Sequence, residues 1–447
     1  MKKTRLAVIL VLVVLCAASW LRLGGQVLGK AGRVSALAGQ ARAYQEQRLY
    51  ALAADAYLQA IEADPSRELY DALLATCRDY YAEEHTSSVK KKLLAAYESA
   101  VAEYPKEAAY WEGYAQVYLD AGSCPNAVAV LEKAAAAHAE SETLDAQWRQ
   151  AYYGYKTLYK AYEQISLREQ GGVYAVSEGG LAGTVDAACK PVQEMQYRYV
   201  GPAGEDDAVL CVTEDDEVRL FSKKGVMIAR FQAPVEEARG YGCGLIPVRL
   251  RDRSDWCYLD LNGNEVCGGF AQAGMFQKNT AAAQLPGGEW CLIDTEGSQK
   301  SENTWQEVRL DESGRYRQDS VVMLKTDGVW KLYTASGKEK EGFSCQDIDI
   351  CCDGGYIAFE QGGRWGFVDT DGKVVIEPRY EAARSFSGGV AAVCSGGVWS
   401  FIDEAGVCVA EGAFADAGYF SAESGTCPVM PDDGAGEWRL IAWRVAR

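Results

Sequence analysis

The stretch Trp365-Gly366-Phe367-Val368-Asp369-Thr370-Asp371-Gly372 decides the fold of this chain. Aromatic and β-branched residues lead up to Asp369, and two polar residues and a glycine follow, which predicts a strand that runs into a tight turn. Gly372 would take the positive φ that a side chain penalises. The segment Asp369–Gly372 also resembles the start of a calcium loop, but no glutamate closes it at the required distance, so we interpret it as a hairpin turn.

The same phrase recurs along the C-terminal two-thirds of the sequence, with a Trp seven residues before a Gly. Its copies are Trp256 and Gly263, Trp290 and Gly297, Trp330 and Gly337, Trp365 and Gly372, and Trp399 and Gly406. Each unit also has a half with an aromatic or acidic start, such as Glu237–Tyr241 or Tyr380–Phe386. With degenerate copies at both ends, the count is about eight units of about 34–40 residues, the length of a propeller blade or a short β repeat.

These units predict a β-repeat array over residues 162–447. We expect a propeller-like ring of about seven or eight units, because closure removes exposed sheet edges. An open array of β-hairpins is the alternative.

The stretch Trp365–Pro378 resembles the WG-repeat (KWG) proteins of bacteria, whose units begin Trp-Gly, reach an Asp-x-x-Gly-Lys turn and end in Pro. The other copies keep the Trp and the turn Gly but lose the Gly after the Trp, so they are divergent. The resemblance implies an interaction or surface module and brings no catalytic residues. We expect the repeat Trp residues to be packing anchors between units; an aromatic platform for glycan rings or peptides is the alternative.

Residues 31–161 are rich in Ala, Leu, Tyr, Glu and Lys, with apolar residues at helical spacing. A 34-residue register fits three times and resembles tetratricopeptide repeats, in which small residues let paired helices approach. We expect helical hairpins capped by a helix over Leu144–Tyr159. The resemblance implies a groove for a protein or peptide partner, lined by Ser35, Arg42, Gln45, Arg78, His85, Glu112 and Gln116. Arg42 and Arg78 would face an acidic peptide or a C-terminus there, whereas the simpler interpretation is two solvated arginines on a helix face.

The first 30 residues predict where the protein works. Lys2, Lys3 and Arg5 precede an apolar run that extends from Leu6 to Leu23. This pattern predicts a transmembrane signal anchor over residues 1–30, a single pass through the cell membrane with the bulk of the chain outside the cytoplasm. A cleaved signal peptide is the alternative and would give a secreted protein.

Composition limits the chemistry. The net charge of −18 disfavours nucleic acid as a partner. His85 and His138 are the only histidines, and we single out no catalytic, cofactor-binding or metal-ligating residue; no cofactor is expected. The 15 cysteines fit either disulfides in an exported chain or small buried hydrophobic residues.

Together these features predict a membrane-anchored, non-enzymatic scaffold that binds a protein or peptide partner through its helical and β repeats. A cell-wall glycan-binding module or a wall-acting enzyme is the alternative. A cleft where acidic residues and exposed Trp rings converge would favour the alternative, whereas buried repeat Trp residues would favour the scaffold.

Overall fold

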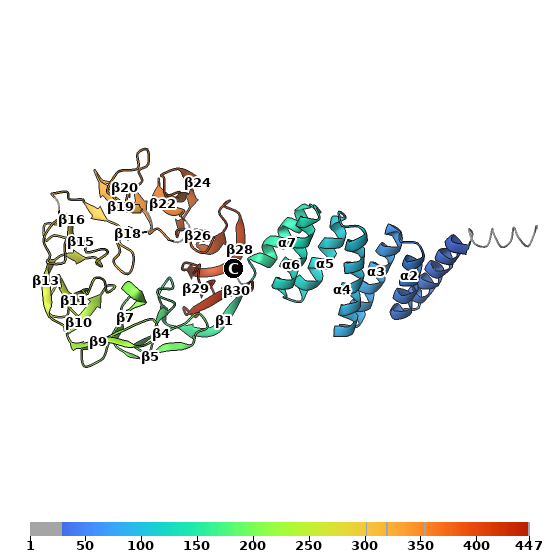
Figure 1. Ribbon diagram of the computed structural model, residues 1–447, viewed down its shortest axis with the longest axis horizontal. Helices are drawn as coiled ribbons and strands as arrows, with labels where there is room; N and C mark the ends of the chain where they lie inside the picture. The colour runs from blue at the N-terminus through green and yellow to red at the C-terminus, as the bar shows by residue number, and fades with distance from the viewer. Residues whose placement is uncertain (1–28, 301, 319–320, 353–354, 446–447) are drawn as a thin grey trace, which may run out of the picture. The chain divides into compact units, whose positions relative to one another are not determined.

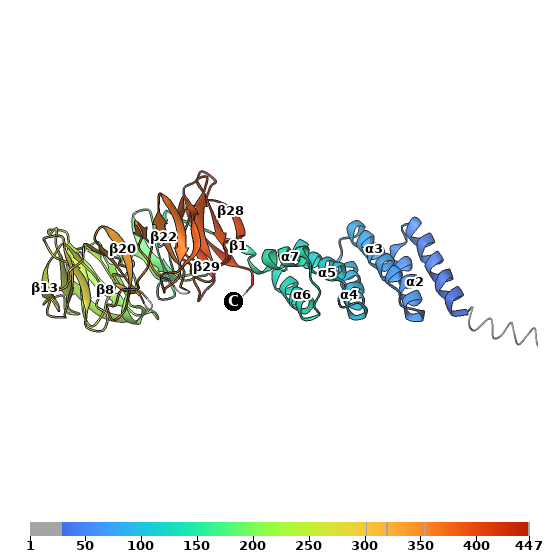
Figure 2. The same ribbon diagram turned by 90° about the horizontal axis from the view of Figure 1, so that it is seen from above.

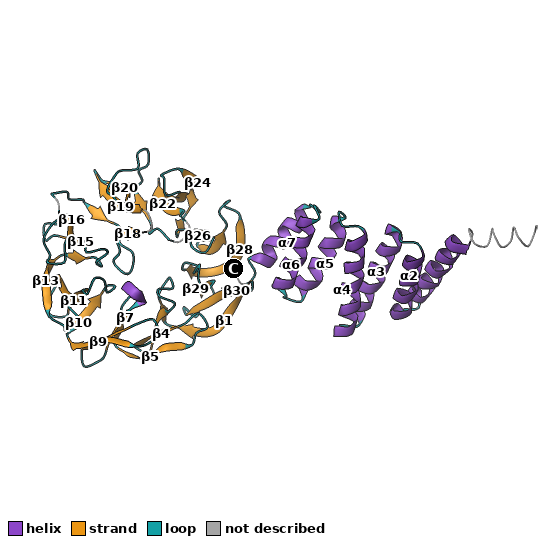
Figure 3. Cartoon of the chain, in the orientation of Figure 1, coloured by secondary structure: helices purple, strands orange, loops and turns teal. Residues whose placement is uncertain are grey.

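The computed structural model describes residues 29–300, 302–318, 321–352 and 355–445. The chain divides into two compact parts, a helical part (Met1–Tyr152) and a β part (Tyr153–Arg447), which Figure 3 distinguishes by colour. The expected anchor over residues 1–30 lies almost wholly outside the described residues. Among the helices that are described, none is long and apolar enough to cross a membrane.

From residue 29 onward, the helical part contains seven helices, of which the first comprises residues 29–46. The others are α2 (Tyr50–Ala63), α3 (Arg67–Glu83), α4 (Ser87–Glu103), α5 (Ala108–Asp120), α6 (Cys124–Ala136) and α7 (Glu142–Tyr152). Consecutive helices from α2 onward pack on one another, as Figure 2 shows. Ala53, Ala60, Ala100 and Ala127 are fully buried, so small side chains let the helices approach closely. Short loops with capping residues separate them; Ser66 Oγ, for example, accepts a hydrogen bond from Leu69 N.

The boundary between the two parts differs from the expected one. The helix predicted over Leu144–Tyr159 ends at Tyr152, and Tyr155–Tyr162 form strand β1. The division therefore falls before Tyr153 and not at Tyr162. The physical reason is a tertiary partner: β1 pairs with β30 (Trp438–Trp443) at the far end of the chain, which local sequence cannot reveal.

The β part is built of small antiparallel units, which we call blades one to eight. Blades one to three are β2 (Gln164–Ile165), β3 (Tyr174–Glu178), β4 (Leu181–Val185) and β5 (Pro191–Tyr197); β6 (Tyr199–Val200), β7 (Val209–Val212), β8 (Glu217–Phe221) and β9 (Met227–Gln232); and β10 (Val235–Ala238), β11 (Ile246–Leu250), β12 (Trp256–Leu259) and β13 (Glu265–Phe270). Blades four to six are β14 (Gln272–Ala273), β15 (Ala281–Gln284) and β16 (Trp290–Ile293); β17 (Glu307–Val308), β18 (Arg317–Gln318), β19 (Val321–Thr326) and β20 (Val329–Thr334); and β21 (Asp347–Ile348), β22 (Ile357–Gln361), β23 (Arg364–Val368) and β24 (Val374–Tyr380). Blade seven is β25 (Ala382–Ala383), β26 (Ala391–Ser395), β27 (Val398–Ile402) and β28 (Cys408–Ala417), and blade eight is the end of β28 with β29 (Thr426–Pro431), β30 and β1.

The blades follow one another around a ring (Figure 1). Tyr155 lies opposite Trp443 and Tyr162 opposite Trp438, so the first strand of the β part completes the last blade. No described sheet closes on itself. Instead, the last blade contains both the first strand, β1, and the last strand, β30, of the β part.

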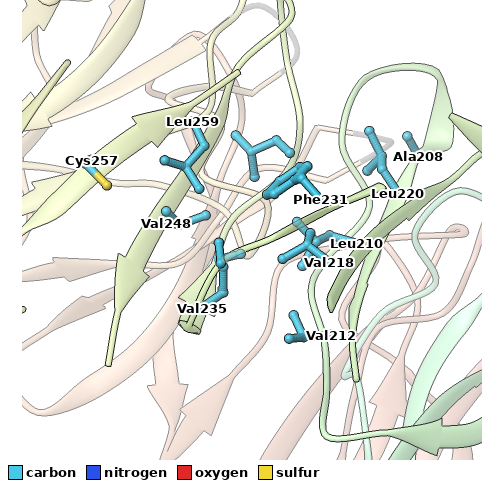
Figure 4. Packing of buried hydrophobic residues seen from close by; sticks show 13 residues of the cluster. Ala208, Leu210, Val212, Val218, Leu220, Phe231, Val235, Val248, Cys257 and Leu259 are labelled. Atoms are coloured by element: carbon cyan, nitrogen blue, oxygen red, sulfur yellow. The ribbon is translucent and has the colours of Figure 1, made fainter. Parts of the chain in front are cut away.

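Eight clusters of buried apolar residues fill the interfaces between neighbouring blades. Figure 4 shows the cluster between blades two and three, which contains Leu210, Phe231 and Val248. The cluster between blades eight and one joins Leu440 to Tyr174. An open row of hairpins would leave that last interface unmade, so the structure favours the ring over the open array.

The repeated phrase forms the expected strand and turn. Asp369 Oδ1 accepts hydrogen bonds of 2.9 Å from the backbone N–H groups of Asp371 and Lys373, and Gly372 has φ +90°. The turn glycines of the other copies also have positive φ values, which are 83° for Gly263, 83° for Gly297, 85° for Gly337 and 75° for Gly406.

The repeat Trp residues lie in the interfaces between blades. Trp256, Trp290 and Trp330 are buried, and Trp365 and Trp399 are half-buried. Each belongs to, or packs against, the cluster shared with the next blade.

Candidate functional site in the centre of the ring

One backbone hydrogen bond recurs in every blade and defines an equivalent position. The residue directly after the first strand of each blade donates its backbone N–H to a carbonyl oxygen of the strand that pairs with the first strand. The distance from nitrogen to oxygen is 2.7 to 3.0 Å. The eight residues that donate it are Ser166, Gly201, Arg239, Gly274, Arg309, Asp349, Arg384 and Gly418. The backbone at these eight positions is thus repeated while the side chain differs from blade to blade. Such positions can give a repeat fold its binding specificity.

Five of these eight residues line one cavity of about 730 Å³. The lining comes from blades one, two, three and five to eight, so the cavity lies where the loops after the first strands meet. Its size falls in the range of about 300–1,000 Å³ that is common for ligand sites. Its charged side chains are Glu237, Arg239, Asp311, Glu312, Asp349 and Arg384.

Arginine occupies the equivalent position in blades three, five and seven. Arg239, Arg309 and Arg384 stack on Trp256, Trp330 and Trp399 of their own blades, with 5.1, 4.6 and 5.1 Å from guanidinium carbon to ring centroid. The three arginines are half-buried, and such cation–π contacts stabilise a guanidinium that is partly withdrawn from water.

Each of these arginines also reaches the next blade. Arg239 donates to Gln272 Oε1 at 2.9 Å and Arg384 donates to Asp416 Oδ1 at 3.0 Å; Arg309 donates to Asp347. All three acceptors stand two residues before the equivalent position of the following blade. In three alternate blades, blades three, five and seven, an arginine at the equivalent position thus joins one blade to the next, whereas blade one has Ser166 at that position.

Asp349 lies among neighbours from two other blades. It accepts hydrogen bonds from Ser385 N at 2.7 Å and from the Tyr419 hydroxyl at 2.8 Å to each oxygen. Arg384 lies 5.7 Å from the Tyr419 ring centroid. Burial, together with the nearby Asp349 carboxylate, raises the pKa of Tyr419 well above its ordinary value.

The loop of blade five that follows β17 contacts four other blades. Ser313 Oγ donates to Ala203 O at 2.7 Å, Gly240 N donates to Ser313 O at 2.8 Å, and Met275 N donates to Gly314 O at 2.8 Å. Glu312 in the same loop accepts from Gln170 Nε2 of blade one. The Glu312 side chain is exposed to solvent in the cavity, and partial desolvation of its carboxylate by the surrounding loops raises its pKa.

The paired polar groups favour a structural use of this centre. Asp349, Arg239 and Arg384 have partners within the ring, and Glu237 accepts from Arg249 Nη2 at 3.3 Å. Among the described residues no three His, Cys, Asp or Glu side chains are grouped as metal ligands. Both histidines of the chain lie in the helical part, so the cavity has no histidine for general base catalysis.

The residues expected to line a helical groove are distributed over three helices and a loop. Ser35, Arg42 and Gln45 lie in the helix of residues 29–46, Arg78 in α3, and Glu112 and Gln116 in α5; His85 lies in the loop after α3.

Two of these residues contact α7. Ser141 Oγ donates to Glu112 Oε1 at 2.6 Å, and Gln147 Nε2 donates to Gln116 Oε1 at 2.9 Å. Gln45 Nε2 reaches Asp79 Oδ2 at 3.5 Å. Ser35, Arg42, Arg78 and His85 are exposed. The structure thus joins Glu112 and Gln116 to the neighbouring helix and leaves the two arginines facing solvent.

Sequence reasoning missed the central polar contacts. It recognised the half-units Glu237–Tyr241 and Tyr380–Phe386 but assigned no role to the arginine in each. An arginine at the same place in three alternate units, at Arg239, Arg309 and Arg384, was the available signal. The contact between Asp349 and Tyr419 has no such signal, because neither residue recurs at the equivalent place in other units.

Comparisons with known proteins add the following. No curated protein was found that matches the chain. Solved structures similar to it include a eukaryotic initiation factor (11% identity, 58% of this chain and 78% of that chain, TM-score 0.39) and the Dos1 propeller (12% identity, 61% and 90%, TM-score 0.38). Another is Hsv2 of Kluyveromyces lactis (9% identity, 64% and 97%, TM-score 0.35). A family described as "WG containing repeat" matches residues 365–399, from β23 of blade six to Trp399 of blade seven.

Proposed function

We propose that this protein is a non-enzymatic scaffold that binds a protein or peptide partner. The observation that carries this proposal is that Asp349, Arg239 and Arg384 in the cavity are paired with other groups of the ring. Groups that already hydrogen-bond one another stabilise the ring, and they are not poised to transfer protons or to attack a substrate.

The positions of the Trp residues support the same proposal. A glycan-binding module or a wall-acting enzyme would require exposed Trp rings that converge with carboxylates. The cavity has carboxylates, but none of the described residues that line it is a Trp. The repeat Trp residues instead pack between blades.

We further propose that the helical part is a tetratricopeptide-like stack that holds the partner. Exposed Arg42 and Arg78 would attract an acidic peptide or a C-terminal carboxylate, whereas Glu112 and Gln116 keep α5 and α7 in register. Small residues buried between the helices are consistent with such a stack.

The proposed location is the outer side of the cell membrane, with residues 1–30 as a single-pass anchor; a cleaved and secreted form is the alternative. The basic and apolar N-terminal sequence supports this proposal. External protease should degrade the protein in intact cells, and membrane fractions should contain it with its N-terminus uncleaved. Protection of the full chain from external protease would contradict the proposal.

The partner experiment is cross-linking and pull-down of the full chain from its native membrane. Arg42→Glu with Arg78→Glu should leave the melting temperature unchanged and remove the principal captured protein, because both side chains are exposed. Lys91→Glu with Lys92→Glu on α4 is the charge-matched control and should retain it. Capture of the same proteins by all three forms would exclude the groove as the binding face.

A further inference from the structure

A cleft of about 390 Å³ lies between blades four and five. Its lining is largely apolar and aromatic, with Gly337, the turn glycine that follows β20, at one edge. The apolar and aromatic side chains that line it are Leu292, Val308, Val322, Leu324, Ala335, Trp305, Tyr316 and Tyr333.

The backbone of blade five repeats that of blade four along this edge. Trp290 N donates to Trp305 O at 2.8 Å, and Trp330 N donates to Cys345 O at 2.9 Å. In the same way, Lys300 N donates to Leu292 O and Lys340 N donates to Leu332 O, both at 2.8 Å. Trp290, Leu292, Lys300 and Trp305 of blade four thus correspond to Trp330, Leu332, Lys340 and Cys345 of blade five.

By this correspondence Asn303 is the counterpart of Phe343, since Asn303 stands two residues before Trp305 and Phe343 stands two residues before Cys345. Phe343 is buried between blades five and six, where its ring packs edge-on against Phe359 at 5.3 Å. It shares a core cluster with Leu332 and Ile348.

The counterparts of these neighbours line the cleft. Leu292 corresponds to Leu332. Val308 and Leu324 pair with each other in blade five, as Ile348 and Phe359 do in blade six. The cleft is therefore equivalent to the site that the Phe343 side chain fills at the next interface. Asn303 stands at the position equivalent to Phe343.

The space in front of each turn glycine shows independently that the interface between blades four and five lacks a side chain that the other interfaces have. A methyl group built on Gly263, Gly297 or Gly372 would lie 2.7 Å from Phe231, 2.6 Å from Cys267 and 3.0 Å from Phe343, which all belong to the preceding blade. A methyl group on Gly406 would lie 3.4 Å from Ile376. At Gly337 no described atom comes within 4 Å of such a methyl group.

We propose that this cleft binds an aromatic side chain of a partner protein, in the place that Phe343 takes one interface further on. The proposal rests on the proposed scaffold function and names one binding site for it. An aromatic side chain in a desolvated pocket is a common anchor of protein interfaces. Arg317 also lines the cleft, and its buried Nε has no acceptor among the described residues. A backbone carbonyl next to the bound aromatic residue would supply that acceptor.

The test uses the full chain and N-acetyl-phenylalaninamide as the probe, with N-acetyl-alaninamide as the reference compound. Saturation-transfer NMR should show transfer to the ring protons of the aromatic probe with the native protein. Asn303→Phe should abolish that transfer and raise the melting temperature, because the new ring fills the cleft as Phe343 fills its own. Asn303→Ser leaves the cleft open and should retain the transfer.

Asn303→Leu is a second filling variant if Asn303→Phe does not fold, and it should also abolish the transfer. Equal transfer in the native protein and in a folded filling variant would overturn the proposal, as would no transfer in the native protein. A dimer of the native protein that Asn303→Phe dissociates would assign the cleft to a second copy of the chain and likewise overturn it. If the pull-down still captures partners while the probe does not bind, only the cleft is excluded and the scaffold function stands.

Discussion

Tyr419 of blade eight donates its hydroxyl to both carboxylate oxygens of Asp349 of blade six, at 2.8 Å each. Between them in the chain stands blade seven, whose Arg384 lies over the Tyr419 ring and donates to Asp416 of blade eight. Three blades are therefore joined by one polar cluster at the centre of the ring. Because each of these groups is partly or fully withdrawn from water, loss of one partner leaves another without a hydrogen bond.

Tyr419→Phe should lower the free energy of unfolding by about 1–3 kcal/mol, since it removes a donor from a carboxylate that is withdrawn from water. The ring is retained, so packing changes little, and Ser385 N remains as a donor to Asp349. Denaturant unfolding of the full chain measures the loss. Tyr159→Phe is the matched control, because Tyr159 is 98% exposed and should tolerate the change. Equal stabilities of the two variants would contradict the structural role of this contact.

Glu312→Gln should stabilise the protein at neutral pH. Burial raises the pKa of Glu312, so its ionised form is less favourable in the folded chain than in the unfolded chain. This raised pKa gives a penalty that is absent below the ordinary glutamate pKa and grows as the pH rises through the folded value. Gln170 can donate to an amide oxygen as it does to the carboxylate.

Melting temperatures of the native protein and of Glu312→Gln, measured across that pH range, check this expectation. The difference should grow from low pH to neutral pH. Glu163→Gln, which alters an exposed glutamate on another loop, should show no such trend. The positive charge of Arg168 opposes the effect of burial on the pKa of Glu312, so a variant less stable than the native protein at neutral pH would show that Arg168 holds Glu312 in its ionised form.

The repeat Trp residues should differ in their contributions to stability according to their burial. Trp330 is 2% exposed and lies in the core between blades five and six, whereas Trp365 is half-buried. Trp330→Ala should therefore cost about 3–5 kcal/mol, the usual range for truncation of a buried aromatic side chain, and Trp365→Ala should cost less. Denaturation midpoints of the two variants measure the order. A larger loss for Trp365→Ala would mean that the Trp residues do more than pack between blades.

Sequence patterns predicted the parts of this fold that depend on local order. The turn at Asp369–Gly372 and its copies follow from residue types within eight positions, since the carboxylate and the glycine act on their own backbone. The helical hairpins follow from periodic small residues such as Ala53 and Ala60.

Contacts between distant segments could not be predicted in this way. Strand β1 mixes residues that favour helices with residues that favour strands, and it pairs with β30 at the far end of the chain. The carboxylate of Asp349 meets the Tyr419 hydroxyl because the ring brings blades six and eight together. The alternating arginines Arg239, Arg309 and Arg384 were visible in the sequence, but their meaning depends on the Trp residue beneath each one.

The buried cysteines should be unreactive in the folded protein. Cys257 and Cys345 lie in blade interfaces, and burial raises the pKa of Cys257 to about 11 and that of Cys345 to about 12. Because the thiolate is the reactive form, both should resist a thiol reagent at pH 8 and react only after unfolding. Mass spectrometry of peptides alkylated before and after denaturation identifies each site. Cys257→Ala and Cys345→Ala should leave the rates at which the remaining thiols react unchanged, since each cysteine acts as a small apolar side chain. Rapid modification of Cys257 in the native protein would show that the interface between blades two and three opens in solution.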